Sequence, residues 1–290
     1  MRMADEDVVS AWLTTKQPSS QRVYEPVVAE FRGFLGKPLE DASRADVIAW
    51  QASWAGEVKP ATEARKLRTL RSLYRFGQQY ADWPTNPLLT IADPHVEDPL
   101  EKRMPSPEDV WALMAAAEQH GPFAAALVTF VFGTGCRISE VVATTWGAII
   151  PGRTPWAWDV PNRRPPQMFP LRPEVVAALQ RWRVVQGLDP TQWSRTDPTP
   201  LFPDRFGKPM RPVALTVAIR RLAVKAHLKA YPAFALRHAH AELALSHGAS
   251  LTLLKRTLGH HRLSSTARYL RPEVQLPAAT SDFLPWKPPK

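Results

Sequence analysis

The chain has 290 residues, with 37 basic and 27 acidic side chains and a formal net charge of +10. This length is enough for about two domains, and the basic excess indicates a polyanionic partner, either a nucleic acid or an acidic membrane surface. The single cysteine, Cys136, excludes an intramolecular disulfide framework and a multi-cysteine zinc site.

The charge is unevenly distributed along the chain. Residues 1–100 contain 12 basic and 14 acidic side chains, a net charge of −2, whereas residues 101–290 contain 25 and 13, a net charge of +12. The longest charge-free apolar stretch, Pro122–Cys136, is shorter than the roughly 20 residues that a membrane-spanning helix needs. The acidic N-terminus is unlike a secretory signal. We therefore expect a soluble, cytoplasmic protein without a membrane partner.

The first 90 residues contain four segments in which apolar residues recur at helical spacing. The predicted helices are Val8–Leu13, Arg22–Leu35, Arg44–Trp54 and Thr62–Tyr80. On the fourth helix, Arg68, Arg71 and Arg75 lie on a different strip from the leucines. This strip is a candidate surface for nucleic-acid phosphates, with a merely solvated helix face as the other interpretation.

A charged, Pro-rich stretch around residues 93–107 separates these helices from the rest of the chain, and we interpret it as an interdomain linker. Ser106 and Pro107 then restart a helix, with a serine at the N-cap, a proline at the first helical position and acidic residues in the first turn. A second domain is therefore expected from about residue 107.

The second domain alternates helices with a short region of β character. The predicted helices are Phe123–Phe132, Ile138–Trp146, Pro173–Gln186, Val213–His227, Leu236–His247 and Leu251–Leu258. Between residues 147 and 172, six prolines interrupt short β-prone pieces at Trp156–Val160 and Met168–Leu171, a pattern typical of a small hairpin or edge sheet. The fold class is therefore mainly α, in two domains.

Three further segments contain residues suited to phosphate chemistry. They are Gly133-Thr134-Gly135-Cys136-Arg137-Ile138-Ser139-Glu140, Ala235-Leu236-Arg237-His238, and Leu258-Gly259-His260 followed nine residues after the histidine by Tyr269. In order and spacing they resemble the motifs of the tyrosine recombinase (phage integrase) family. Supporting matches are Leu201-Phe202-Pro203, Gly207-Lys208-Pro209 and Asn86-Pro87, so the resemblance covers nearly the whole chain.

The resemblance implies a fold and an activity. The expected parts are an N-terminal four-helix (SAM-like) core-binding domain at residues 1–95, a linker at 96–106, an α-rich catalytic domain with a small antiparallel sheet at 107–272, and a Pro-rich tail at 273–290. The two domains would close on double-stranded DNA as a C-shaped clamp. The implied protein is a site-specific recombinase of the short Xer-like type or of the transposon or integron type. It would act at the nucleoid as a homo-tetramer on paired inverted-repeat sites, through a Holliday junction.

By the same resemblance, Arg137 and Arg237 clamp the reacting phosphate, His260 supports them, and Tyr269 forms a 3′-phosphotyrosyl bond. Glu140, one turn after Arg137, would orient that arginine. The residue types suit these roles, because a tyrosine hydroxyl can attack a phosphodiester without a metal or nucleotide cofactor. Arginines bind the charged oxygens of the transition state bidentately. No cofactor and no metal are expected, since His238 and His240 point to opposite sides of a helix.

Two positions depart from the family pattern. Phe234 stands where the family usually has a histidine, and phenylalanine cannot exchange a proton. The family's catalytic lysine has no counterpart between residues 160 and 166, where Arg163 and Arg164 occur instead. An arginine there could bind a phosphate but is a poor general acid. His238 or water is the expected substitute in proton transfer.

Other basic residues complete the candidate DNA contacts, namely Arg220, Arg221 and Lys225 on the predicted helix Val213–His227. Two alternative functions stay open at this point. One is a catalytically impaired, site-specific DNA-binding protein that kept the fold, and the other is a type IB topoisomerase-like enzyme that cuts and reseals one duplex. Covalent capture on DNA separates the first alternative from the enzymes, and exchange between two marked duplexes separates recombination from relaxation.

Overall fold

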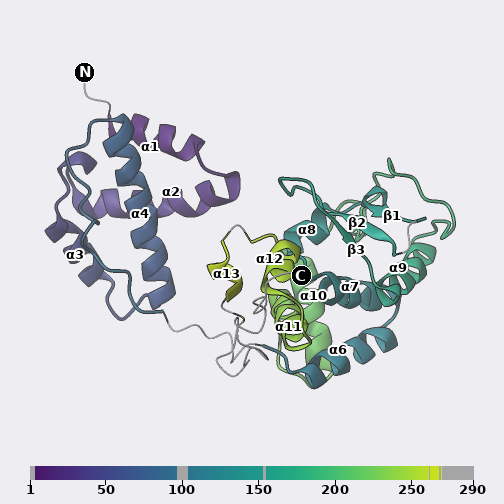
Figure 1. Cartoon of the computed structure of the whole chain (residues 1–290). Helices are drawn as coiled ribbons and strands as arrows, with labels where there is room; N and C mark the ends of the chain where they lie inside the picture. Colours follow the sequence, from purple (N-terminus) through teal and green to yellow (C-terminus); the bar gives the residue numbers. More distant parts are fainter. Residues whose placement is uncertain (1–3, 97–103, 153–154, 261, 268, 270–290) are drawn as a thin grey trace, which may run out of the picture. The chain divides into compact units, whose positions relative to one another are not determined.

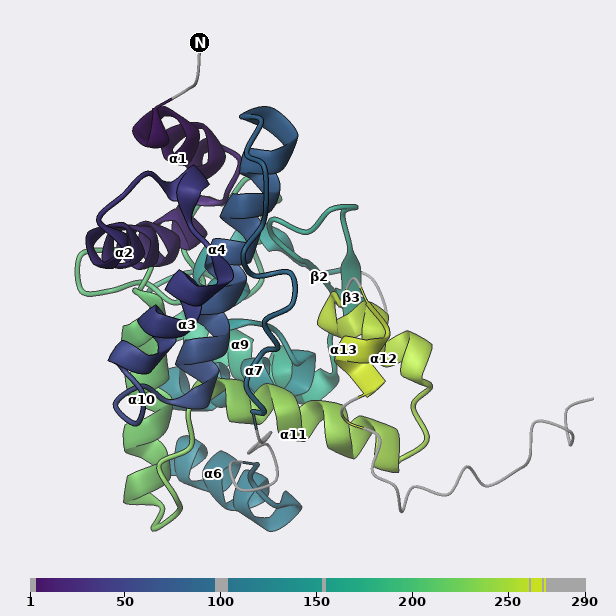
Figure 2. The ribbon, with the colours of Figure 1, turned by 90° about the vertical axis from the view of Figure 1, so that its left-hand side faces the viewer.

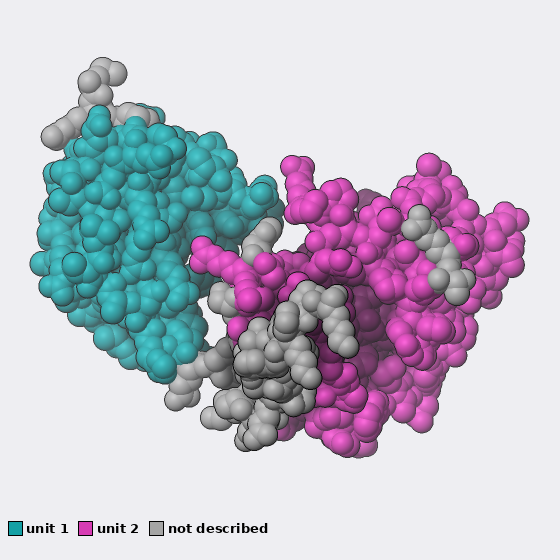
Figure 3. Space-filling view, in the orientation of Figure 1, with its two compact units in different colours: residues 1–98 teal, residues 99–290 magenta. Residues whose placement is uncertain are grey.

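The border between two structural units falls within residues 96–106, where the sequence analysis places a linker. The units are residues 1–98 and residues 99–290, drawn in different colours in Figure 3. The computed structural model describes residues 4–96, 104–152, 155–260, 262–267 and 269. The expected tail at 273–290 therefore lies outside the described residues.

Four α-helices build the described part of the first unit (Figure 1). They are α1 (Asp5–Thr14), α2 (Pro18–Leu35), α3 (Arg44–Ser53) and α4 (Pro60–Tyr80), with a short 3₁₀ turn, η1 (Leu39–Asp41), between α2 and α3. The four predicted helices are confirmed, and α2 and α4 start earlier than predicted because Pro18 and Pro60 occupy their first turn. The helices share a core that includes Trp12, Trp50 and Tyr74.

The second unit is a helical bundle with a small sheet at one side. Its helices are α6 (Pro107–His120), α7 (Pro122–Thr134), α8 (Ile138–Ala143), α9 (Pro173–Val185), α10 (Pro212–Lys225), α11 (Ala233–Ser246), α12 (Leu251–Leu258) and α13 (Ser264–Ala267). The helix α7 is central, because α6, α9, α10 and α11 all pack against it. Its sequence is apolar on every side, as expected for a helix surrounded by others.

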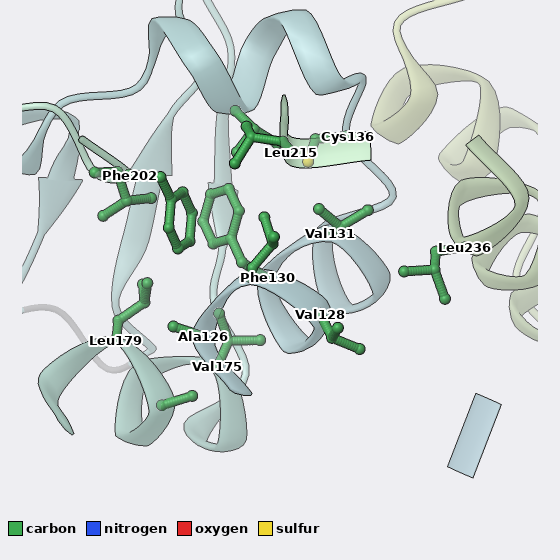
Figure 4. Close-up of a cluster of buried hydrophobic side chains, with 14 of the residues drawn as sticks. Ala126, Val128, Phe130, Val131, Cys136, Val175, Leu179, Phe202, Leu215 and Leu236 are labelled. Atoms are coloured by element: carbon green, nitrogen blue, oxygen red, sulfur yellow. The ribbon is translucent and has the colours of Figure 1, made fainter. Parts of the chain in front are cut away.

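The core of the second unit is built around Phe130 of α7. Figure 4 shows Phe130 facing Phe202, with Val175 and Leu179 of α9 below them and Cys136 near Leu215 at the top of the view. The two phenylalanine rings lie edge to face, and their centroids are 6.4 Å apart. Cys136 is fully buried and burial raises the pKa of its thiol to about 12, so this cysteine is a packing residue.

Three short antiparallel strands form the sheet. They are β1 (Ile149–Ile150), β2 (Ala157–Asp159) and β3 (Met168–Pro170), in the order β1-β2-β3, with Ile149 opposite Trp158 and Trp158 opposite Phe169. The predicted hairpin is confirmed, whereas β1 lies where no strand was predicted.

The predicted helix Ile138–Trp146 is wrong beyond Ala143. Thr144 leaves the helical conformation (φ −78°, ψ 130°), and its carbonyl accepts a hydrogen bond from the backbone N–H of Leu201 at 2.9 Å. Pairing with the segment before Leu201 therefore ends α8, and a 3₁₀ turn, η2 (Trp146–Ala148), leads into β1.

Local signals in the sequence fix two helix ends of the second unit. The side chain of Ser106 accepts a hydrogen bond from the backbone of Asp109, so the predicted N-cap of α6 is present. Gly259 ends α12 in the left-handed conformation (φ +62°), which turns the chain into His260.

Within the described part of the chain, no helix is long and apolar enough to cross a membrane.

Candidate active site

Arg137 lies at the N-cap of α8, directly after the loop that ends α7. Its backbone N–H donates to Oε2 of Glu140 (2.8 Å), Nη1 donates to Oε1 of Glu140 (3.0 Å), and Nη2 donates to the carbonyl of Gly259 (3.0 Å). The side chain nevertheless stays 43% exposed. Glu140 thus orients the guanidinium and leaves it accessible to an anion.

Gly135, two residues before Arg137, has no room for a side chain. Its φ of +61° lies in the left-handed region, and a Cβ atom would come within 2.6 Å of Cδ2 of His240. The imidazole of His240 hydrogen-bonds through Nδ1 to the carbonyl of Phe132 at 2.7 Å, and burial lowers the pKa of this histidine. His240 is therefore a packing residue that fixes the loop. No group of three or more potential metal ligands occurs among the residues that the structure describes.

Arg237 lies on α11 and is only 7% exposed. Its Nη1 donates to the carbonyl of Gly135 (2.7 Å), and its Nη2 donates to the carbonyl of Leu258 (2.6 Å) and lies 3.2 Å from Nε2 of His260. Burial, followed by the positive charge of Arg137, lowers the pKa of Arg237 to about 10, so the group remains charged at neutral pH. Arg237 therefore ties all three motifs together.

His260 and Tyr269 complete the group. Nδ1 of His260 lies 2.9 Å from Oγ1 of the buried Thr266, so the imidazole bridges that threonine and Arg237. The hydroxyl of Tyr269 lies 2.5 Å from Nδ1 of His238, the residue that follows Arg237 on α11. The ring of Tyr269 is nearly parallel to that of His260, with centroids 6.5 Å apart.

The ring of Tyr269 is 6% exposed and packs into an apolar cluster of α11 and α12 residues, namely Ala241, Leu245, Leu254 and Leu258. An aromatic ring held by packing on one side presents its hydroxyl in a fixed direction. The structure therefore brings together the four residues to which the sequence analysis assigns the chemistry.

The loop between β2 and β3 sends Arg163 into the same region. Nε of Arg163 donates to Oε1 of Glu140 (2.8 Å) and Nη2 donates to Oε2 (3.2 Å), while Nη1 donates to Oε1 of Gln167 (2.9 Å) and to the carbonyl of Thr257 (2.8 Å). The side chain is 7% exposed. Arg163 is thus occupied by protein partners, whereas the sequence analysis considered it for phosphate binding. Figure 2 shows the hairpin beside α12.

Glu140 is held ionised by two arginines. Its burial would raise the pKa of the carboxyl, but hydrogen bonds from the side chain of Arg163 and the backbone of Arg137 hold the pKa below its ordinary value. A buried carboxylate with two guanidinium partners is a stable anchor for both of them. Spacing predicted the contact with Arg137, one turn away, but contained no signal for the contact with Arg163.

A basic pocket of about 590 Å³ opens beside this network. Besides Arg137, Glu140 and His260, it is lined by four cationic side chains, those of Arg163, Arg164, Lys255 and Arg256. Lys255 and Arg256 were not predicted from the sequence. The available signal was their position in the last turn of α12, immediately before the third motif. The pocket has the charge and size to receive a phosphate group.

The basic residues of α10 face two different hollows. Arg220 lines a hollow of about 620 Å³ together with Arg137, Phe234 and His238. In contrast, the exposed side chains of Arg221 and Lys225 border a smaller hollow against α6 and α7. Of the three, the structure therefore brings only Arg220 to the four motif residues.

The strip of Arg68, Arg71 and Arg75 on α4 is partly paired with an acidic residue. Arg71 forms an ion pair with Asp93 (2.9 Å), donates to the carbonyl of Ile91 (2.8 Å) and is 17% exposed. Arg68 pairs with the same carboxylate (2.7 Å) but remains 64% exposed. Arg75 is exposed and lines a hollow with both of them. Arg71 therefore serves mainly to anchor the chain after α4.

The chain is similar to known proteins in both sequence and fold. The sequence pattern of the Phage integrase family matches residues 104–275. The tyrosine recombinase XerC of Erythrobacter litoralis is 30% identical over 245 residues, which cover 81% of this chain and 76% of that relative.

Solved structures share the fold at low sequence identity. The XerH site-specific recombinase bound to a palindromic difH substrate, in a post-cleavage complex, has a TM-score of 0.72 at 16% identity and covers 86% of this chain and 75% of its own. A lambda integrase tetramer bound to a Holliday junction has a TM-score of 0.69 at 15% identity, with 92% and 77% covered. These likenesses confirm the mainly helical fold with its small antiparallel sheet.

Proposed function

The chain belongs to the phage integrase family of tyrosine recombinases, which break and rejoin DNA, and we propose that it does so through a 3′-phosphotyrosyl bond on Tyr269. The observation that supports this assignment is the convergence of Arg137, Arg237, His260 and Tyr269 from separate segments. Hydrogen bonds link Arg237 to His260, and Tyr269 to the neighbour of Arg237 on α11.

In the proposed cleavage step, the phenolic oxygen of Tyr269 attacks a DNA phosphorus, and the bond from phosphorus to the 5′ oxygen of the next nucleotide breaks. The phosphotyrosyl bond conserves the energy of the phosphodiester, so rejoining needs no nucleotide cofactor. A free 5′ hydroxyl then attacks the phosphotyrosyl phosphorus and releases the tyrosine. When that hydroxyl belongs to a second duplex, strands are exchanged, and two rounds of exchange pass through a Holliday junction.

The two arginines and His260 stabilise the transition state in this proposal, because negative charge grows on the non-bridging phosphate oxygens during attack. Arg137 is accessible beside the basic pocket, where Arg164, Lys255 and Arg256 add positive charge. Fixed donors of this kind are each worth about 10²–10³ in rate. Glu140 and the backbone carbonyls keep the guanidinium groups aimed before DNA arrives.

We assign residues 1–95 to a core-binding domain and residues 107–272 to the catalytic domain, which would close on duplex DNA as a C-shaped clamp. The net charge of +12 on residues 101–290 supports the assignment of most phosphate contacts to the catalytic domain. The exposed Arg68 and Arg75 of α4 would contribute contacts from the other side.

Assembly on DNA follows from the same chemistry. Exchange between two duplexes needs a nucleophile at each of four strands, so we assign a homo-tetramer on two sites, each with inverted repeats. The lambda integrase tetramer bound to a Holliday junction, whose fold this chain shares, supports this assignment. The place of action is then the DNA of the nucleoid, in the cytoplasm.

A second candidate function is a site-specific DNA-binding protein with impaired catalysis. It is favoured by Phe234 at the usual histidine position and by the lack of a lysine between residues 160 and 166. A nicking-closing activity on a single duplex, as in type IB topoisomerases, uses the same four residues and differs only in whether a second duplex takes part.

The experiment that separates these functions uses two duplexes with different end labels, each with the inverted-repeat site. Wild-type protein is expected to produce duplexes that combine both labels, and Tyr269→Phe is expected to bind the site but produce none. Tight binding without any covalent adduct would support the impaired protein. Adducts and relaxation without mixed-label products would support the single-duplex enzyme.

A further inference from the structure

The hydroxyl of Tyr269 lies 2.5 Å from Nδ1 of His238, and we propose that His238 is the general base that accepts the proton of Tyr269 during cleavage. The inference rests on the proposed function, because it requires Tyr269 to be the nucleophile. In the neutral tautomer with its proton on Nε2, the Nδ1 atom accepts the hydrogen bond from the hydroxyl. A base within hydrogen-bond distance can take the proton directly.

The position of His238 on α11 accounts for the unusual residue at 234. Residues 234 and 238 are one turn apart and lie on the same face of the helix. The ring of Phe234 packs edge to face against the imidazole, with centroids 5.5 Å apart and an interplanar angle of 80°. Phe234 cannot exchange protons, but this contact restricts rotation of the imidazole. The proton acceptor has therefore moved one helical turn along α11.

The charges around the pair suit proton transfer from the phenol. Three guanidinium groups line the same hollow as His238, those of Arg137, Arg220 and Arg237. Their positive charge favours a phenolate over a neutral phenol. Glu242 follows one turn after His238 on α11 and supplies negative charge on the same helix face. The imidazole of His260 also lies near the tyrosine, nearly parallel to its ring with centroids 6.5 Å apart.

The proton balance of the step is complete with water as the only co-reactant. As the bond from the tyrosine oxygen to phosphorus forms, the phenolic proton moves to Nδ1 of His238, which becomes an imidazolium. The 5′ oxygen leaves with the electron pair of the broken bond and takes a proton from solvent water. During rejoining, the 5′ hydroxyl gives its proton to solvent, and the imidazolium returns its proton to the departing Tyr269.

The test compares wild type with His238→Asn in single-turnover cleavage of a suicide duplex that is nicked beside the cleavage point. The asparagine amide oxygen lies close to the position of Nδ1 and still accepts a hydrogen bond, but it cannot take up a proton. We expect unchanged DNA affinity and adduct formation slower by about 10²-fold near pH 7. The wild-type rate should rise and level off as histidine becomes neutral, between about pH 5.5 and 8. The variant should lack this plateau and approach wild type only at higher pH.

The matched control is His247→Asn, an exposed histidine at the end of the same helix, which should leave the rate and its pH dependence unchanged. If His238→Asn matches wild type, or is slower by the same factor at every pH, the proposal is overturned.

A second substrate, with sulfur at the bridging 5′ position, separates a base from an acid, because a thiolate leaves without protonation. The defect of His238→Asn should persist on this substrate, and its disappearance would make His238 an acid and overturn the proposal. An absence of adduct with the wild type would contradict the proposed function itself.

Discussion

The two arginines of the site, Arg137 and Arg237, differ in how far their guanidinium groups are buried and bonded to other protein groups. Arg237 is buried and bonded to the carbonyls of Gly135 and Leu258. Arg137 is bonded to Glu140 and Gly259 but keeps 43% of its side chain exposed. Arg137 is therefore the more accessible of the two to the phosphate of the proposed mechanism, and Arg237 also holds the three motifs together.

Replacement of Arg137 by lysine tests the bidentate clamp. Lysine keeps the positive charge but loses the planar fork and the simultaneous contacts with Glu140 and Gly259. We expect adduct formation on a suicide duplex to fall by roughly 10²-fold or more, with site affinity nearly unchanged, since one transition-state donor is worth about 2.7–4 kcal/mol. Arg172→Lys, at an exposed ion pair on α9, is the control. Wild-type cleavage by Arg137→Lys would show that this arginine has only a structural role.

Motif spacing predicted which residues of the site meet, but not all of their partners. The four residues Arg137, Arg237, His260 and Tyr269 could be predicted because each belongs to a local pattern of fixed spacing. The ion pair of Arg163 with Glu140 joins positions 23 residues apart, and only the fold brings such positions together. The sequence of a Pro-rich loop does not distinguish a basic side chain that is exposed to solvent from one that is buried.

At the scale of elements, the β2–β3 hairpin is fastened to α8 and α12 through Arg163. The guanidinium donates to Glu140, which follows Arg137 by one turn, and to the carbonyl of Thr257 near the end of α12. Arg163 therefore joins the hairpin to the first motif through a buried ion pair, and to the residue just before the third motif through a hydrogen bond.

Arg163→Met is expected to lower the free energy of unfolding by about 3–5 kcal/mol at neutral pH, because it leaves the Glu140 carboxylate buried with one partner fewer. Adding Glu140→Gln to this variant should recover part of the loss. Chemical denaturation of the wild type and both variants measures these differences. A loss below about 1 kcal/mol is the range of an exposed ion pair and would contradict the account.

The lowered pKa of Glu140 gives the stability a defined pH dependence. A carboxyl whose pKa is lower in the folded state stabilises the protein above its ordinary pKa, and this contribution disappears as the pH falls through the folded-state value. The difference in unfolding free energy between the wild type and Glu140→Gln should therefore be largest near pH 7 and shrink below about pH 4.5. A difference that does not change between these pH values would mean that Glu140 is not held ionised by its partners.

Neighbouring residues on α10 provide a matched pair for DNA binding. Arg220 lines the hollow that contains Phe234 and His238, whereas Arg221 borders the other hollow. Arg220→Gln should reduce the slope of log K against log salt concentration by about 0.9, the value for one phosphate contact, while Arg221→Gln leaves it unchanged. Equal slopes for the two variants would mean that DNA does not bind preferentially at Arg220, and its contacts would then lie elsewhere on this unit.

At the scale of the whole molecule, the long elements could be predicted from the sequence and the shortest could not. Helices such as α4 and α9 have enough turns for apolar periodicity to emerge, and their starts have proline signals. The strand β1 has two residues and the helix α13 has four. Both are too short for a periodic spacing of apolar residues to be recognised in the sequence. The family resemblance, which depends on motif order, is confirmed by the match over residues 104–275.

The family match and the positive charge fall on the same part of the chain. Residues 101–290 have a net charge of +12, and the four motif residues converge within this part. In the proposed function, one unit thus combines electrostatic attraction to DNA with the groups that act on phosphate. The first unit contributes the partly paired strip of Arg68, Arg71 and Arg75 on α4.

The central claim is that Tyr269 becomes covalently joined to DNA without help from a metal ion. The direct measurement is mass spectrometry of the protein after reaction with a suicide duplex in excess chelator, followed by nuclease and protease digestion. The account predicts a nucleotide remnant on the peptide that contains Tyr269, and none in Tyr269→Phe. A remnant on another residue, or an adduct that disappears with the chelator, would contradict it.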